Sequence, residues 1–198
     1  MVEIDHYDAL ILGSGQGGKL LAWHLARSSM RTAVVERRDI GGSCPNIACM
    51  PSKNEVWAAR IAYLTQHAAQ FGTITGPVTV DMAKVVQRKR DMVDREIAGH
   101  LEAYKASGAE LIMGSGHFVA PKTLEVQSNN GGVRRLTGDK VFINVGSHAG
   151  DPGYSGPRGG TAANAYRGAR PGLRTLAPHR ARRGLCRAGT GAGLSPLR

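Results

Sequence analysis

A glycine-rich turn near the start of the chain places the strongest limit on its fold. The turn, residues 13–18 (GSGQGG), lies between an apolar run at residues 8–12 and a helix-like segment at residues 19–27. A second β-rich run, residues 32–35, follows and leads into Glu36. This order of strand, glycine turn, helix, strand and acid predicts a dinucleotide-binding fold, and a plain β–α turn is the alternative.

Each glycine of the turn has its own expected role. Gly13 permits the tight turn, Gly15 lets the backbone approach a pyrophosphate, and Gly18 lets the helix and strand pack closely. The start of the helix supplies free N–H groups for the phosphate charge. Glu36 can accept hydrogen bonds from the ribose hydroxyls. We therefore predict cofactor contacts at Gly13, Gly15, Gly17, Gly18 and Glu36.

Two cysteines, Cys44 and Cys49, follow this unit with four residues between them. Zinc sites usually show a two-residue gap and a second Cys/His pair, and the third cysteine, Cys186, is far away, so we expect no metal here. On an ideal helix, residues five apart have Cα atoms roughly 8–9 Å apart. A disulfide needs about 4.4–6.8 Å, so the two cysteines can bridge only where the chain bends or enters a helix between them. Pro45 suits such an entry.

The chemistry of the pair remains open at this point. A thiol near the start of a helix feels the positive end of the dipole, which can lower its pKa to about 3.5–7.5 and give a reactive thiolate. Two buried structural cysteines are the alternative for Cys44 and Cys49.

Residues 41–53 (GGSCPNIACMPSK) resemble the redox-active disulfide motif of the flavin-dependent, class I pyridine nucleotide–disulfide oxidoreductases. That family includes dihydrolipoamide, glutathione and mercuric reductases. The resemblance covers the Gly-Gly-Ser-Cys run, the gap between the cysteines and the closing Pro-Ser-Lys. It implies FAD as the cofactor, with the glycine turn binding its ADP half.

The resemblance also assigns roles to individual residues of this motif. Cys44 resembles the interchange thiol that attacks a disulfide substrate, and Cys49 the thiol that makes a charge-transfer contact with the flavin. Lys53, four residues past Cys49 and on the same helical face, resembles the family's lysine beside the flavin; a solvated charge is the alternative. Gly42 and Ser43 are the remaining cofactor contacts that the motif implies.

Two helices are expected after the motif. Residues 55–70 carry Trp57, Ile61 and Leu64 in an apolar stripe that we assign to the core. Residues 81–107 form a long charged helix, for which Asp81 is a plausible N-cap and Gly108 a plausible C-cap.

Residues 109–145 predict strands at 109–113 and 140–145, with a small antiparallel meander between them. In the family, a similar Gly-x-Gly segment passes the adenine, so Gly116 and His117 are candidate contacts; a surface histidine is the alternative. The later strand of the family ends in a Thr-Gly pair near the flavin. Here the pair is Val145-Gly146, which keeps Gly146 as a candidate contact but lacks the hydroxyl.

The expected fold is therefore an α/β, Rossmann-like FAD/NAD(P)-binding domain over residues 1–148, with a parallel sheet, helices and a small antiparallel meander. The resemblance stops near residue 148. Residues 149–198 contain 11 Gly, 9 Ala, 5 Pro and 9 Arg, and apolar periodicity is lost. We expect this tail to be disordered or to result from a frameshift, because such a composition offers little apolar surface to offset chain entropy.

Charge and hydropathy limit the partners. The net charge is +11, of which the tail holds +8, from nine arginines and Asp151. Nucleic-acid contact is expected only as non-specific, salt-sensitive binding by this tail. No apolar run approaches the ~20 residues of a membrane span, and the N-terminus lacks the pattern of a signal peptide. We therefore expect a cytoplasmic protein that does not enter the membrane.

The resemblance implies a reaction for the intact protein. Electrons would pass from NAD(P)H through FAD to the Cys44–Cys49 disulfide and on to a disulfide or metal-ion substrate. A mercuric reductase-like enzyme is the first interpretation. A dihydrolipoamide dehydrogenase-like enzyme and a non-catalytic nucleotide-binding remnant are the alternatives. Family members are homodimers whose catalytic His-Glu pair and interface domain lie further along the chain, so we expect this truncated chain to be inactive alone.

Overall fold

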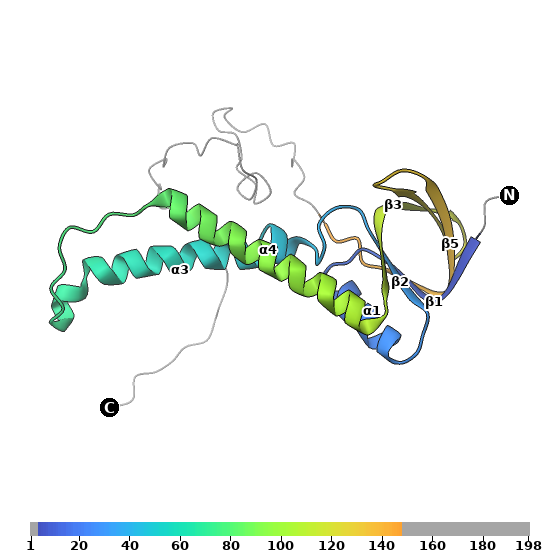
Figure 1. The fold of residues 1–198 in the computed structure, drawn as a ribbon, viewed down its shortest axis with the longest axis horizontal. Coiled ribbons are helices and arrows are strands. Elements are labelled where there is room, and N and C mark those ends of the chain that lie inside the picture. Colours follow the sequence, from blue (N-terminus) through green and yellow to red (C-terminus); the bar gives the residue numbers. More distant parts are fainter. Residues whose placement is uncertain (1–3, 148–198) are drawn as a thin grey trace, which may run out of the picture.

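The structure is a computed structural model that describes residues 4–147 (Figure 1). Helices and strands alternate first, and an antiparallel segment follows. In chain order the elements are β1 (Ile4–Leu12), α1 (Gln16–Arg27), β2 (Thr32–Glu36), α2 (Ser43–Asn46), α3 (Cys49–Gln66), the 3₁₀ helix η1 (Ala68–Phe71), α4 (Met82–Ser107), β3 (Glu110–Ala120), β4 (Thr123–Ser128) and β5 (Val133–Ile143). The predicted α/β class is confirmed.

The parallel part of the sheet has the order β3–β2–β1–β5. β1 lies between β2 and β5, so its residues Ala9, Leu10 and Ile11 have no exposed surface. Such strands read as continuous apolar runs because both of their faces are covered. That is why residues 8–12 were recognisable as a strand from the sequence alone.

β3 and β5 continue past the parallel part and pair with β4 on both of its sides, so the five strands close into a ring. The predicted strands at residues 109–113 and 140–145 are too short, because β3 continues to Ala120 and β5 begins at Val133. A Cβ on Gly114 would lie 2.6 Å from the carbonyl oxygen of Gln127, and one on Gly138 would lie 2.9 Å from Cβ of Leu10. These glycines therefore mark close approaches between paired strands rather than loops.

Two apolar cores lie on opposite sides of the parallel sheet. The first fills the ring and is contributed by all five strands, through Tyr7, Leu10, Ala33, Val35, Ile112, Leu124, Val126 and Leu136. The second lies between the sheet and the helices α1 and α4, with Ala22 and Tyr104 as the buried helical contributions. Helices α1 and α4 therefore cover the face of the parallel sheet opposite the ring interior, and α1 begins at the predicted cofactor turn.

A polar network around Tyr7 lies at the end of the ring where β1, β3 and β5 begin. The Tyr7 hydroxyl donates to Oε2 of Glu110 at 2.6 Å, and Arg134 donates to Oε1 of the same carboxylate at 2.8 Å. Arg134 also donates to Asp5 at 2.8 Å. Because β1, β3 and β5 each contribute a member, the network connects three strands.

Helices α3 and α4 run beside each other and extend away from the sheet as a two-helix arm (Figure 1). The sequence analysis placed Trp57, Ile61 and Leu64 in the core, and this is wrong. Their exposed fractions are 55%, 46% and 40%. Because the arm projects beyond the sheet, one face of α3 meets no other element among residues 4–147. α3 begins at Cys49, which places Cys49 and Lys53 on one helix as expected, and it ends at Gln66 rather than at the predicted residue 70.

Helix α4 has the two predicted caps. The Asp81 side chain accepts a hydrogen bond from the backbone N–H of Lys84 at 3.1 Å. Gly108 follows the last turn with φ of 79°, a left-handed conformation that glycine adopts without steric cost. The caps explain why the bounds of this helix followed from the sequence.

Replacing Asp81 with Ala should reduce the free energy of unfolding by about 1 kcal/mol, because the N–H of Lys84 loses its acceptor. Asp81→Asn keeps an acceptor at the cap and should retain the stability of the parent. Urea denaturation of both variants measures this. Equal losses in the two would instead assign the effect to the exposed Asp81–Lys84 ion pair of 3.9 Å, which is expected to contribute little.

The predicted tail, its Cys186 and the domain boundary at residue 148 lie outside the described residues. Within residues 4–147, each helix is too short or too polar to cross a membrane.

Candidate functional site

The glycine turn joins the end of β1 to the start of α1. Gly13 has φ of 103°, and a Cβ there would lie 2.2 Å from the backbone oxygen of Asn144. A Cβ on Gly18 would lie 2.2 Å from the backbone oxygen of Gly13. The close packing of helix on strand predicted for Gly18 therefore has a direct geometric reason.

Asn144 is a site residue that the sequence analysis missed. It follows β5, and its Nδ2 donates to the oxygen of Gly13 at 3.1 Å. Its side chain would also meet a Cβ on Gly15, at 3.1 Å from Nδ2, and one on Gly17, at 3.2 Å from Oδ1. Asn144 thus holds the turn from the side of β5. A polar residue at the end of an apolar strand was the available signal.

The start of α1 fits a bound phosphate. No side chain caps the helix at Gly15, and its first turn contains no acidic residue. The first N–H groups of a helix have no partner inside the helix and carry its partial positive charge. A dinucleotide pyrophosphate would satisfy these donors, so the residues present fit the ADP half of FAD.

Glu36 ends β2, as predicted, but its carboxylate already has partners in the chain. Oε2 accepts from the N–H and the hydroxyl of Ser14 at 2.9 and 2.7 Å. Oε1 accepts from the N–H groups of Arg38 and Asp39 at 2.8 and 3.1 Å. A ribose hydroxyl would have to share these lone pairs. Glu36 therefore also fixes the glycine turn to the loop that leads to the cysteines.

That loop packs directly on the glycine turn. Gly42 has φ of 76°, and a Cβ there would lie 2.7 Å from Cα of Gly15. The N–H of Gly41 donates to the hydroxyl of Ser14 at 3.0 Å. Asn46 then holds the loop from the other side by donating to the oxygens of Ile40 and Gly42 at 2.9 and 2.7 Å. The dinucleotide turn and the cysteine segment thus form one continuous surface.

The cysteines lie on two different helices, with the bend that a bridge requires between them. Cys44 belongs to the short α2, the chain leaves helical geometry at Ile47 and Ala48, and Cys49 begins α3. Pro45 lies within α2 rather than at the predicted helix entry. Both cysteines are unbridged in the structure.

The surroundings of Cys44 raise the pKa of its thiol, whereas a position near the start of a helix was expected to lower it. A hydrogen bond with Cys49 raises the pKa of the Cys44 thiol, and burial raises it further. The positive charges of Lys19 and Lys53 act in the opposite direction. The hydrogen bond shows that the two thiols lie in contact, and it favours the protonated form of Cys44 while both are reduced.

The structure brings some of the remaining predicted residues to this site. Ser43 is the first residue of α2, and its backbone oxygen accepts from the N–H groups of Ile47 and Ala48 at 2.9 and 2.8 Å. Lys53 lies one turn beyond Cys49 on α3 with an exposed side chain, so its charge reaches Cys44 without a direct contact.

Three other candidates lie on β3 or follow β5. Gly116 is inside β3, where a Cβ would lie 3.1 Å from Leu12 and 3.2 Å from Val35. His117 is on the outer side of the meander, 3.9 Å from Glu125. Gly146 has φ of 68°, and no atom of the described residues lies within 4 Å of its Cβ position. Their predicted adenine and flavin contacts stay predictions.

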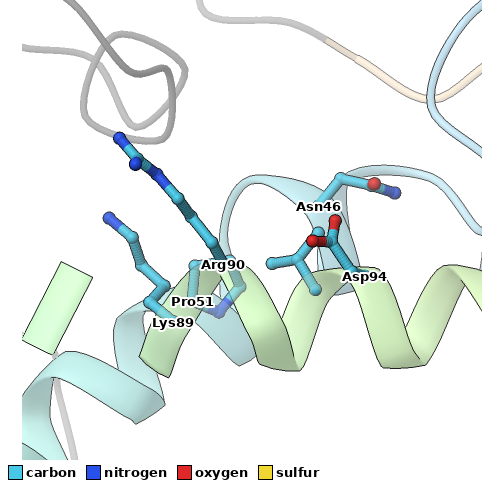
Figure 2. Close-up of a pocket in the computed structure, with 6 residues that line it drawn as sticks. Asn46, Pro51, Lys89, Arg90 and Asp94 are labelled. Carbon is cyan, nitrogen blue, oxygen red and sulfur yellow. The ribbon is translucent and has the colours of Figure 1, made fainter. Parts of the chain in front are cut away.

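A pocket lies between α4 and the residues that follow each cysteine (Figure 2). Figure 2 shows the side chains of Lys89 and Arg90 extending in the same direction from α4. Lys89 is paired with Glu55 at 2.6 Å. The lining residues are Asn46, Pro51, Lys89, Arg90, Val93 and Asp94. None of them is a predicted cofactor contact, although Asn46 and Pro51 belong to the cysteine segment.

Comparison with known proteins identifies close relatives of this arrangement. The chain is 36% identical over 143 residues to the dihydrolipoyl dehydrogenase of Mycobacterium tuberculosis, and 35% over 149 residues to that of Bacillus subtilis. A solved structure, the Cu(II) complex of the HOCl-induced flavoprotein disulfide reductase RclA from Escherichia coli, matches with a TM-score of 0.61 and 27% identity. The relatives therefore favour the dihydrolipoamide dehydrogenase-like alternative over the mercuric reductase-like interpretation.

These matches cover most of this chain but a minor part of each relative. They span 72% and 71% of the chain, and 31% of the length of each of the two dehydrogenases. The RclA match covers 75% of the chain and 30% of that structure. The chain thus spans less than a third of the length of these relatives.

The family described as pyridine nucleotide-disulphide oxidoreductase matches residues 7–181. The match extends past residue 148, where the sequence analysis ended the resemblance. The predicted cofactors, FAD with NAD(P)H, are those of this family and of its dihydrolipoyl dehydrogenases. Since the match includes both the glycine turn and the cysteine pair, the chain belongs to the pyridine nucleotide–disulphide oxidoreductase family.

Proposed function

We propose that this chain forms the FAD-binding, disulfide-bearing part of an oxidoreductase that exchanges two electrons between NAD(P)H and a small dithiol or disulfide. The observation that carries the proposal is the packing of Gly42 on Gly15, because it joins the cysteine segment to the dinucleotide turn. A cofactor held by the turn would therefore lie beside the two thiols.

The chain's own residues divide the work. The turn at residues 13–18 and the start of α1 bind the pyrophosphate, and Glu36 and Asn144 hold the turn in shape. FAD, when bound, supplies the two-electron chemistry between NAD(P)H and the thiol pair. Cys44 and Cys49 store the two electrons. Breaking their disulfide bond takes up two electrons and two protons and yields two thiols.

A lipoyl-type dithiol is the favoured substrate, because the relatives with 36% and 35% identity are named dihydrolipoyl dehydrogenases. A metal ion is the second candidate, supported by the Cu(II) complex of the related RclA structure. Among residues 4–147, no three His, Cys, Asp or Glu side chains gather to hold a metal.

Further properties of the intact protein are proposals from the same resemblance. We expect a homodimer, in which the catalytic His-Glu pair lies beyond the aligned region. The cytoplasm is the proposed location, since a reducing compartment keeps paired thiols available for catalysis. Non-specific nucleic-acid binding by the arginine-rich tail stays a prediction.

Thiol counting tests the disulfide. The air-oxidised, denatured full chain should show one free thiol, Cys186, and three after reduction with dithiothreitol. A Cys49→Ser control should show two thiols after reduction and form no bridge within the 41–53 segment. Three free thiols in the oxidised parent would contradict the redox pair.

FAD uptake tests the cofactor separately. The purified chain should bind FAD that is added in excess, measured by equilibrium dialysis. We expect weak binding, because each Å² of apolar flavin surface left in water forfeits about 25 cal/mol. Absence of uptake in a chain that forms the disulfide would reject the dinucleotide site alone.

The rate of reduction by different dithiols tests the substrate. Faster reduction of the oxidised chain by dihydrolipoamide than by dithiothreitol, at equal thiolate concentration, would favour the lipoyl substrate. Equal rates would remove that preference.

A further inference from the structure

A buried lysine without a carboxylate partner lies under the cysteine loop. Lys19 is on the first turn of α1, and only 5% of its surface is exposed. Its Nζ lies 2.5 Å from Nε2 of His100, a 9% exposed residue of α4. Within residues 4–147 no Asp or Glu forms an ion pair with this ammonium, although Glu96 attracts it from α4. A buried cation in this situation is costly unless another negative charge compensates it.

His100 connects this lysine to the loop that carries Cys44. A Cβ on Gly41 would lie 2.6 Å from Nδ1 of His100, so the imidazole lies against the backbone three residues before Cys44. That Nδ1 is buried and has no hydrogen-bond partner among residues 4–147. Trp23 encloses the pair, with its ring 5.9 Å from both Nζ of Lys19 and the imidazole centre. Little water can therefore reach the Lys19 ammonium.

The charges that face Lys19 come from two elements, α2 and α4. Burial lowers the pKa of Lys19, whereas the negative charges of Cys44 on α2 and Glu96 on α4 raise it. Burial and the neighbouring Lys19 lower the pKa of His100, which favours a neutral imidazole that can accept from the ammonium. Lys19 in turn lowers the pKa of Cys44, against the effects of Cys49 and of burial. The thiolate and the ammonium thus stabilise each other.

We propose that Lys19, held in place by His100, is the buried counter-cation of the Cys44 thiolate that forms when the reduced thiol loses its proton. Lys19 is a positioning and electrostatic residue for the thiol, not a group that contacts substrate. The inference rests on the proposed function only in taking Cys44 as the reacting thiol. In the disulfide form Cys44 carries no charge, so the ammonium loses this partner. Loss of the Cys44 proton in the reduced pair therefore favours a proton on Lys19.

The test measures the titration of Cys44 alone. The full chain carrying Cys49→Ser and Cys186→Ser has one thiol, whose rate of alkylation by iodoacetamide is followed from pH 6 to 11 under reducing conditions. Adding Lys19→Met should move the inflection to higher pH by about one unit, which lowers the thiolate fraction at pH 7.5 about tenfold. Lys84→Met, which removes an exposed lysine of α4, is the matched control and should leave the profile unchanged.

Variants of His100 test whether the Lys19 ammonium must be held in position to act on Cys44. His100→Gln keeps an acceptor for the ammonium and should retain the profile, whereas His100→Leu should shift it in the same direction as Lys19→Met. Circular dichroism confirms folding, which the loss of a buried cation should not impair. An unchanged inflection in Lys19→Met, or an equal shift in Lys84→Met, would overturn the proposal. Because no flavin or substrate is present, these results do not depend on the FAD uptake and thiol counts that test the proposed function.

Discussion

Gly18→Ala should abolish measurable FAD uptake and reduce the free energy of unfolding by about 3 kcal/mol. The added Cβ would lie 2.2 Å from the oxygen of Gly13 and 2.7 Å from Nδ2 of Asn144. The nearer neighbour is backbone, which no rotamer change can move, so α1 must shift away from β1. Overpacking of this kind costs about 1–3 kcal/mol. The same shift displaces the N–H groups that would bind the pyrophosphate, and we expect an affinity at least about 100-fold weaker.

Gly99→Ala is the matched control for this substitution. Gly99 lies on an exposed face of α4, where a Cβ would meet no atom within 4 Å. Alanine there should raise stability by about 0.5–1 kcal/mol through its higher helix propensity and leave FAD uptake unchanged. Urea denaturation and equilibrium dialysis measure both quantities. A Gly18→Ala chain with parental stability and uptake would show that the turn does not need this close approach.

The second large effect is an alkaline loss of stability that depends on Tyr7. Burial, followed by the hydrogen bond to Glu110, raises the pKa of Tyr7 from 10.0 to about 12. The folded chain therefore keeps a proton that the unfolded chain releases between these two values. Stability from this group is complete below pH 10 and falls as the pH rises toward 12. By pH 11.5 the loss relative to pH 9 should be about 2 kcal/mol.

Tyr7→Phe removes the titrating hydroxyl and should remove this part of the alkaline loss. At neutral pH the variant loses the hydrogen bond to Glu110, which costs about 1 kcal/mol, while Arg134 still pairs with that carboxylate. Tyr63→Phe, on the exposed face of α3, is the control. Urea denaturation at pH 9 and 11.5 gives the comparison. Parallel pH profiles for Tyr7→Phe and its parent would contradict the role of this buried phenol.

Features that short stretches of sequence determine were predictable. The glycine turn, the apolar run of β1 and the Asp81 and Gly108 caps all act through neighbouring residues, so their patterns are visible in the sequence. The bend between Cys44 and Cys49 was also expected from spacing, because an unbroken helix holds such a pair too far apart.

Features that join distant residues were not predictable. Asn144 contacts Gly13 across 131 positions, and Lys19 meets His100 across 81. The local sequence marks Asn144 as a polar residue after an apolar strand, but it does not identify the partner of either residue, since the pairing depends on how β5 and α4 are placed in the fold. The prediction that the apolar stripe of α3 lies in the core was wrong for a related reason. An apolar stripe indicates that a helix face is suited to burial, but not which part of the protein covers it.

The position of β1 has a consequence for how the chain reaches this fold. β1 pairs with β5 along its length, from Ile4 with Arg135 to Leu12 with Ile143. Partners about 131 residues apart give this sheet a high contact order, which slows folding because loop-closure entropy is lost before the contact forms. During synthesis, β1 therefore cannot pair with β5 until nearly all of the described residues have been made. Until then one edge of β1 lacks its native partner, and the ring closes only when β5 has emerged.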